Sequence, residues 1–187
     1  MSETNARTAQ DADTQDARFN DHLDAESKVA ERPEDHKTEL RLWLRMLACA
    51  NLIEVEIRQR LRERFDTTLP RFDLMAQLER TEDGLMLGEL SRRMMVSNGN
   101  VTGLVERLVQ SGHIERIASE RDRRAVRVRL TPKGRRDFAV MAAEHADWIG
   151  AFFAELDETD QELLLAQLKG LKHSVLGAIE RRKSSNG

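Results

Sequence analysis

The sequence predicts a mainly α-helical protein with one small β-hairpin, and three observations lead to this fold class. Apolar residues recur at helical spacing over most of the chain after residue 37, as in Leu40, Leu44 and Leu47. The alternation of apolar and polar residues that is typical of strands occurs only in residues 113–119 and 125–131. No apolar run approaches the roughly eighteen residues of a membrane-spanning helix, so none is expected.

The net charge of −3 over 187 residues is unevenly distributed. Residues 1–36 hold ten acidic and four basic side chains and few large apolar ones. Such a segment cannot bury enough apolar surface to offset the entropy of ordering, so we expect a disordered acidic tail. Its simplest role is solubility, and a sharper alternative is competition for a basic face. Residues 113–136 hold nine basic and three acidic side chains, which favours a polyanionic partner.

The use of cysteine limits the possible compartments and cofactors. Cys49 is the single cysteine, which excludes an internal disulfide and a multi-cysteine zinc site. The N-terminus has no apolar signal-peptide core. These features favour a cytoplasmic protein that needs no metal or other cofactor.

The first helix, expected from about Glu39 to Phe65, is apolar on two faces. One stripe consists of Leu40, Trp43, Leu44, Leu47, Ala48 and Leu52, and the other of Leu42, Met46, Ile53 and Ile57. A helix of this kind needs two partners, namely its own core and a second surface. A second copy of the chain is a plausible source of that surface.

Two short helices in the middle of the chain form the next pattern, after a helix that begins at Pro70. They are expected at Leu87–Met94 and from about Asn98 to Ser111, with about three residues between them. Ser97 can cap the second helix, and Gly112 can end it in a left-handed conformation. This arrangement predicts a helix-turn-helix.

The solvent face of the second short helix is polar and carries mostly small residues. It consists of Asn98, Asn100, Thr102, Gly103, Glu106 and Arg107. Small side chains allow a helix to enter the major groove of DNA, where Asn can pair with adenine and Arg with guanine. We therefore expect this helix to read DNA bases.

The two alternating stretches predict a hairpin with the arginine-rich residues 120–124 at its tip. Arg121, Arg123 and Arg124 would project from a narrow loop, a shape suited to the DNA minor groove. Asp122 is expected to hold one neighbouring guanidinium in a bidentate ion pair. By charge alone such a cluster is more often a solvated edge, but its position directly after a helix-turn-helix favours a DNA-binding wing.

Two further helices complete the chain. The first begins at Pro132, is capped by Thr131 and runs to about Leu156, and the second follows residues 157–160. The last helix has a regular apolar spacing at Leu164, Leu168, Leu171, Val175 and Ile179. This spacing indicates a seam for another helix.

The order of these elements resembles the MarR family (multiple-antibiotic-resistance-type) of winged helix-turn-helix transcriptional regulators. The resemblance covers about Leu40 to Ile179, and its most specific motifs are SNGNVTGLVERL at 97–108, GHIER at 112–116, DRR at 122–124 and RLTPKG at 129–134. It implies a winged helix-turn-helix DNA-binding domain at residues 67–136. It also implies a helical dimerisation region made of residues 37–66 and 137–183.

The resemblance further implies a homodimer, usually a repressor, that binds a pseudo-palindromic operator. The two recognition helices would lie about 34 Å apart, or a multiple of that. Carried over by motif position, the residues on the major-groove helix are Ser97, Asn98, Asn100, Thr102 and Arg107. Arg123 or Arg124 would enter the minor groove, and Asp122 would brace the wing.

Family members commonly bind small aromatic carboxylates between the dimer helices and the winged helix, which releases DNA. Several regulators of aromatic catabolism respond to aryl-CoA thioesters, and residues 71–80 and 94–100 look like that branch. The predicted lining residues are Trp43, Met46, Phe72, Met75, His145 and Trp148, with Arg41 or Arg45 for an anionic group. For each, core packing or a solvated arginine is the alternative.

An enzyme is not expected, because the chain has no nucleophile elbow, phosphate-binding glycine loop or HExxH motif. The five histidines share no ligand spacing, and only His145 and His173 could meet.

Redox sensing through Cys49 is a second alternative. In the family branch that senses peroxides, the reactive cysteine lies earlier in the first helix and has tyrosine partners. Cys49 lies in the middle of the helix, and this chain has no tyrosine. Both differences favour a buried structural cysteine. A helical protein-interaction module is the third alternative.

Overall fold

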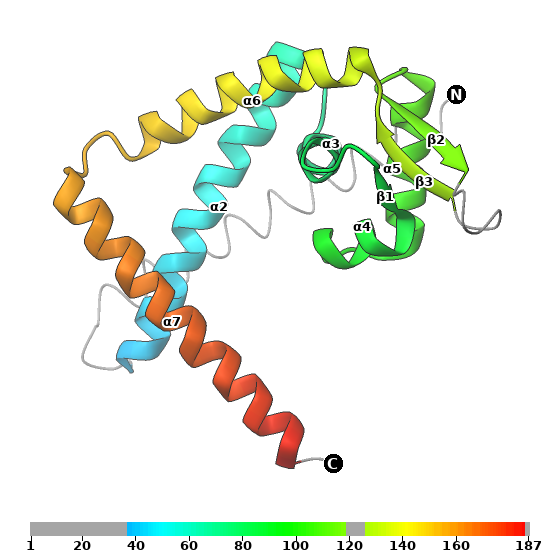
Figure 1. Ribbon diagram of the computed structural model, residues 1–187. Helices are drawn as coiled ribbons and strands as arrows, with labels where there is room; N and C mark the ends of the chain where they lie inside the picture. The colour runs from blue at the N-terminus through cyan, green and yellow to red at the C-terminus, as the bar shows by residue number, and fades with distance from the viewer. Residues whose placement is uncertain (1–36, 119–125, 186–187) are drawn as a thin grey trace, which may run out of the picture. The chain divides into compact units, whose positions relative to one another are not determined.

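A computed structural model describes residues 37–118 and 126–185 (Figure 1). Its elements are α2 (Thr38–Phe65), α3 (Leu69–Glu79), β1 (Leu85–Met86), α4 (Leu87–Met94), α5 (Asn98–Gln110), β2 (Ile114–Ala118), β3 (Val126–Leu130), α6 (Pro132–Phe152) and α7 (Glu158–Ser185). This is the mainly helical fold with a small sheet that the sequence predicts. The predicted acidic tail, residues 1–36, and the wing tip lie outside the described residues.

The sheet has three antiparallel strands in the order β1-β3-β2 (Figure 1). Ile114 pairs with Leu130 and Arg116 with Val128, while Leu85 of β1 pairs with Val128 from the other side. Leu85, Ile114, Val128 and Leu130 are almost fully buried, as alternation predicts. Strand β1 is not predicted by the sequence, because two residues are too few to show a period of two.

The core of the winged helix lies between the sheet and the three helices α3, α4 and α5. Leu74, Leu78, Leu90, Val101 and Val105 have no exposed surface. Each buried aliphatic side chain contributes about 1.5–3 kcal/mol relative to an exposed one. This packing holds α4 and α5 as the predicted helix-turn-helix.

The start of α6 is tied to the end of α5 through Thr131. Its hydroxyl donates to the carbonyl of Gly112 over 2.7 Å and accepts the amide of Gly134 over 3.0 Å, so Thr131 caps α6 as predicted. Gly112 has φ of 73°, the left-handed conformation expected for the residue that ends α5. The start of α6 therefore lies beside the C-terminal end of α5.

By packing, the chain divides into one unit that ends at Ala142 and a second that begins at Ala143. The second unit holds the remainder of α6 and all of α7, and α7 has no buried residue in the single chain. The large apolar residues that it exposes are Leu163, Leu164, Leu165, Leu168, Leu171, Val175, Leu176 and Ile179. Among the described helices, none is long and apolar enough to cross a membrane.

Gly134 lies very close to the backbone of His113, and this contact leads to a testable prediction. A Cβ atom at this position would lie 1.9 Å from the carbonyl oxygen of His113, a backbone atom that cannot turn away. We expect Gly134→Ala to lower the free energy of unfolding by about 1–3 kcal/mol through overpacking.

Urea unfolding at one fixed protein concentration measures this effect. Gly150→Ala is the matched control in the same helix, because a Cβ atom there meets nothing within 4 Å. The control should be neutral or slightly stabilising. Equal unfolding midpoints for the two variants would contradict the close contact.

Candidate nucleic-acid interface

The N-terminus of α5 has the cap that its sequence predicts. Ser97 has an extended backbone, and its Oγ accepts the amide N–H of Asn100 over 3.3 Å. The turn before it is held by Ser91, whose hydroxyl donates to the carbonyl of Val96 over 2.6 Å. Met95 takes the left-handed conformation in this turn, with φ of 56°, and is 93% exposed. The start of α5 is thus fixed relative to α4.

Burial fixes the rotation of α5 about its axis. Val101, Val105 and Leu108 are buried on one face of the helix. Ser97, Asn98, Asn100 and Arg107, four of the predicted base-reading or phosphate-binding residues, are exposed. The polar face that the sequence predicts is therefore presented to solvent.

Thr102, the fifth predicted residue of this helix, differs from the other four. It is half-buried, and its Oγ1 donates to the carbonyl of Asn98 over 2.9 Å. The hydroxyl proton is thus used within the helix, which leaves the oxygen lone pairs and the methyl group as its outward groups. A methyl group is suited to contact the C5-methyl of thymine.

Two glycines, Gly99 and Gly103, lie one helical turn apart on α5. A Cβ atom at either position would meet nothing within 4 Å, so no contact within the described chain requires glycine there. Each glycine inside a helix destabilises it by about 1 kcal/mol relative to alanine. The pair makes this part of the helix surface unusually shallow.

The arginines of β2 and β3 are engaged in contacts with neighbouring parts of the fold. Arg127 donates to the carbonyls of Asp83 and Gly84 over 3.1 and 2.8 Å. Arg129 forms an ion pair of 2.7 Å with Glu115 across the two strands. These arginines brace the hairpin, so the strand residues supply less free positive charge than the sequence suggests.

The wing tip itself is not described. The predicted minor-groove arginines, Arg121, Arg123 and Arg124, and the predicted bracing residue Asp122 lie outside the described residues. The register of β2 and β3 brings the ends of these strands together, with Ala118 opposite Val126. The described ends of β2 and β3 therefore lie side by side, as a hairpin requires.

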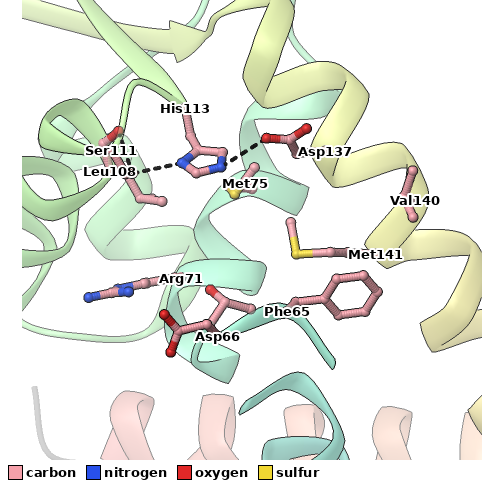
Figure 2. Close-up of a pocket in the computed structure, with 11 residues that line it drawn as sticks. Phe65, Asp66, Arg71, Met75, Leu108, Ser111, His113, Asp137, Val140 and Met141 are labelled. Atoms are coloured by element: carbon pink, nitrogen blue, oxygen red, sulfur yellow. Dashed lines mark hydrogen bonds and ion pairs between the residues drawn. The ribbon is translucent and has the colours of Figure 1, made fainter. Parts of the chain in front are cut away.

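A cavity of about 450 Å³ lies at the junction of α3, the C-terminal end of α5 and the first turns of α6 (Figure 2). The end of α2 and the start of β2 complete its lining. Met75, Leu108 and Met141 are buried apolar residues of this lining. Of the eight predicted effector-binding residues, Met75 is the one that lines this cavity.

His113, between α5 and β2, organises the polar side of the cavity. Its Nδ1 lies 2.7 Å from Ser111 Oγ, and its Nε2 lies 2.9 Å from Lys133 Nζ. The same Nε2 lies 3.2 Å from Asp137 Oδ2, so it can accept from the ammonium group of Lys133 or, when protonated, donate to the carboxylate. Lys133 also donates to Asp137 Oδ2 over 2.9 Å. Figure 2 shows His113 between Ser111 and Asp137, each joined to it by a dashed line.

The net effect of these surroundings on His113 favours a neutral imidazole, although Asp137 acts in the opposite direction. Burial lowers the pKa of His113 below its usual 6.5, and the nearby charge of Lys133 acts in the same direction. The hydrogen bond from Lys133 lowers the pKa of Asp137 below its usual 3.8. The network therefore pairs a neutral histidine with a charged lysine and carboxylate.

The other predicted effector-binding residues are placed in different surroundings. Phe72 is buried, and its ring centroid lies 5.4 Å from that of Phe138. In the second unit, Trp148 is buried and lies edge-on to His145 at 6.5 Å, and burial lowers the pKa of His145. The rest belong to α2, where Arg41, Trp43 and Arg45 are exposed and Met46 is half-buried. Their role in effector binding stays a prediction.

The expectation of a buried structural cysteine is wrong for the single chain. Cys49 is exposed, whereas its neighbour Ala48 is buried. Successive residues of a helix point about 100° apart, so burial of one does not extend to the next. Among the described residues, no three His, Cys, Asp or Glu side chains are grouped to hold a metal ion.

Comparison with known proteins gives consistent matches. Residues 67–126 match the model of the MarR family. The transcriptional activatory protein BadR of Rhodopseudomonas palustris is 34% identical over 137 residues, which cover 71% of this chain and 76% of BadR. The crystal structure of a MarR family transcriptional regulator from Silicibacter pomeroyi is 32% identical and has a TM-score of 0.62, covering 73% of this chain and 94% of that one.

A further structural match concerns the fold. FabT of Streptococcus pneumoniae, whose crystal structure is in complex with DNA, has a TM-score of 0.64 and is 24% identical, covering 74% of this chain and 98% of that one. This similarity, over nearly the whole of FabT, extends the structural agreement beyond the winged helix.

The histidine network makes a prediction about pH. Because the pKa of His113 is lowered in the folded state, the unfolded chain binds more protons just below the usual pKa of 6.5. Stability from this group is therefore complete above pH 6.5 and declines as the pH falls below it. The pKa of Asp137 is lowered from 3.8, so this carboxyl group changes the stability only in a more acidic pH range.

We expect His113→Asn to flatten the loss of stability between about pH 7.5 and about pH 5.5. Urea unfolding midpoints at each pH measure it, with His173→Asn, an exposed histidine of α7, as the control. His145 should leave a residual slope, because its pKa is lowered as well. Parallel curves for the wild type and His113→Asn would contradict the prediction.

Proposed function

The chain belongs to the MarR family, and on that premise we propose that this DNA-binding transcriptional regulator acts as a homodimeric repressor of a pseudo-palindromic operator. Its matched relatives are transcriptional regulators, not enzymes. In this proposal residues 67–136 bind DNA, and residues 37–66 and 137–183 hold the two copies together. A small aromatic carboxylate or its CoA thioester releases the operator.

The observation that carries the DNA-binding part is the exposed polar face of α5. A recognition helix must present hydrogen-bonding side chains close to base edges, and its own fold must hold it rigidly. Ser97, Asn98, Asn100 and Arg107 are exposed on a helix whose opposite face is buried. The shallow surface at Gly99 and Gly103 would let the backbone approach the floor of the major groove closely. Arg121, Arg123 and Arg124 would add minor-groove contacts, with Asp122 as their brace.

The exposed apolar residues of two helices support a homodimer. In the single chain α7 has no buried residue, and α2 exposes Leu40, Leu42, Trp43 and Leu52. A large apolar surface of this kind on one chain marks an interaction site. A second copy of the chain would cover the exposed apolar surface of both helices. A symmetric dimer also suits a pseudo-palindromic operator.

Repression requires only that the bound dimer blocks a promoter. The relative BadR is described as a transcriptional activatory protein, which makes activation the second candidate for this chain. Redox sensing through the exposed Cys49 is a further candidate, since an accessible thiol can be oxidised.

The proposal predicts a specific and salt-sensitive footprint on DNA upstream of the protein's own gene. For each phosphate contact, the logarithm of the association constant should fall by about 0.9 for every tenfold rise in salt concentration. Footprinting and fluorescence anisotropy over a salt series measure both properties, and sedimentation should find two chains per operator. A helical interaction module would give neither a footprint nor a steep salt dependence, and such a result would refute the proposal.

A second prediction concerns the glycine pair of α5. Gly103→Ala should raise the free energy of unfolding by about 0.5–1 kcal/mol, because alanine favours the helix. It should also weaken operator binding, because the added methyl group keeps the backbone from the groove. Gly150→Ala, which also has open space, should leave operator affinity unchanged. If Gly103→Ala binds the operator as tightly as the wild type, the close approach is wrong.

Asn100→Ala is the complementary variant on the same face. It should change base preference at one operator position by about 1–3 kcal/mol if Asn100 reads a base edge. Competition with single-base operator variants measures this preference. Equal loss on all sequences would instead assign Asn100 to the phosphate backbone.

A further inference from the structure

Met95, in the turn of the helix-turn-helix, has a backbone conformation that is unfavourable for its residue type. Its φ of 56° and ψ of 35° lie in the left-handed region. Among the described residues, Asp66 is the other non-glycine residue with a positive φ. Aspartate tolerates this conformation because its short polar side chain can bond locally, whereas methionine has no such compensation. Glycine is the usual residue where a helix ends in this way, so the fold itself does not favour methionine here.

The side chain of Met95 does not offset this conformation by packing. It is 93% exposed, the highest value among the large apolar residues that the structure describes. One exposed apolar side chain is ordinary on a protein surface. An exposed side chain that also holds its backbone in an unfavourable conformation is not ordinary, and such residues are concentrated at functional sites.

The turn holds the backbone of Met95 in one position. Ser91 Oγ donates to the carbonyl of Val96 over 2.6 Å, and the amide of Val96 donates to the carbonyl of Ser91 over 3.2 Å. The amide of Met95 donates to the carbonyl of Arg92 over 3.4 Å. These bonds fix the chain on both sides of Met95. A contact residue on a fixed backbone loses little backbone entropy when it binds a partner.

The surroundings of Met95 favour nucleic acid over protein as that partner. Arg92 and Arg93, which precede it in α4, are exposed, and so are Ser97 and Asn98, which follow it. A surface that docks a protein groups several apolar side chains in one patch. Here one apolar side chain lies between basic and small polar residues, a setting typical of a DNA-binding face.

Met95 also lies near the bases that α5 would read. It precedes Asn98, the first residue of α5, by three residues, so their Cα atoms lie within about 11 Å of each other. A thioether side chain carries no charge for a phosphate and no strong donor for a base edge. The apolar group that the major groove presents is the C5-methyl of thymine.

We infer that Met95 packs against the C5-methyl group of a thymine beside the bases contacted by α5, and that it thereby contributes to operator specificity. This inference rests on the proposed function, because the contact requires α5 in the major groove. Asn98 and Asn100 can read hydrogen-bonding groups of base edges, whereas Met95 reads a group that forms no hydrogen bond. The exposed methionine thus has a role in recognition that it lacks in the fold.

Replacement of single thymines by deoxyuridine in the footprinted duplex tests this contact. Deoxyuridine lacks the C5-methyl group and pairs with adenine as thymine does. Fluorescence anisotropy with the full-length wild type should find one thymine in each half-site whose replacement lowers the affinity about fourfold, as expected for one buried methyl group. Met95→Ala should bind the unmodified duplex about fifteenfold more weakly, because both copies lose the contact, and should be insensitive to replacement of that thymine.

Two further variants separate the contact from effects on folding. Met86→Ala is the matched control, because Met86 of β1 is also exposed, and it should keep the affinity and the thymine sensitivity of the wild type. Met95→Gly should raise the urea unfolding midpoint, because glycine adopts the left-handed conformation freely. It should nevertheless lose the thymine sensitivity, as Met95→Ala does. A more stable but less specific variant excludes misfolding as the cause.

Three results would overturn the inference and leave the proposed function intact. They are a footprint in which no deoxyuridine weakens binding, equal thymine sensitivity in the wild type and Met95→Ala, and a lower unfolding midpoint for Met95→Gly. The last result would show that the side chain serves the fold. Absence of any specific footprint would instead remove the proposed function, and this inference with it.

Discussion

The burial of one face of α5 determines what this protein can present to DNA. Val101, Val105 and Leu108 pack into the core formed with α3, α4 and β2. A rotation of α5 by one residue, about 100°, would expose these side chains and bury the asparagines. Since each buried aliphatic residue contributes about 1.5–3 kcal/mol, the rotation is strongly fixed. Base recognition by this helix would thus depend on apolar packing on its opposite side.

The same helix is mechanically linked to α6 through a small set of backbone contacts. The end of α5 at Gly112, the cap residue Thr131 and the close approach of Gly134 to His113 join the two helices without a flexible linker. A packed joint of this kind transmits displacement, because tightly packed groups cannot absorb a shift locally. The cavity lies beside this joint, and its polar side is made by His113 and its neighbours.

The helices outside the winged helix show a different balance of forces. The single chain leaves α7 without a buried residue and exposes much of the apolar surface of α2. Such helices are only marginally stable on their own, since most helical stability in proteins comes from packing of an apolar face. In the proposed homodimer their stability would be linked to assembly, so folding and dimer formation would both depend on protein concentration.

Local signals in the sequence determine the secondary structure. The period of apolar residues, the cap at Ser97, the stop at Gly112 and the start at Thr131 and Pro132 act over a few residues, and each occurs where it is expected. The polar face of α5 follows from the same periodicity. The exception is β1, whose two residues become a strand only because β3 offers them backbone partners.

Only the tertiary structure decided which distant residues meet. The sequence predicts a buried Cys49, but the residue is exposed, and it gives no sign that Arg71, His113 and Met141 share a cavity. It likewise counts Arg127 and Arg129 among the bases of residues 113–136, although Arg127 binds the carbonyls of Asp83 and Gly84 and Arg129 is paired with Glu115. Periodicity specifies the face of a helix on which a residue lies. It does not specify what lies opposite, because that depends on the packing of elements far apart in the chain.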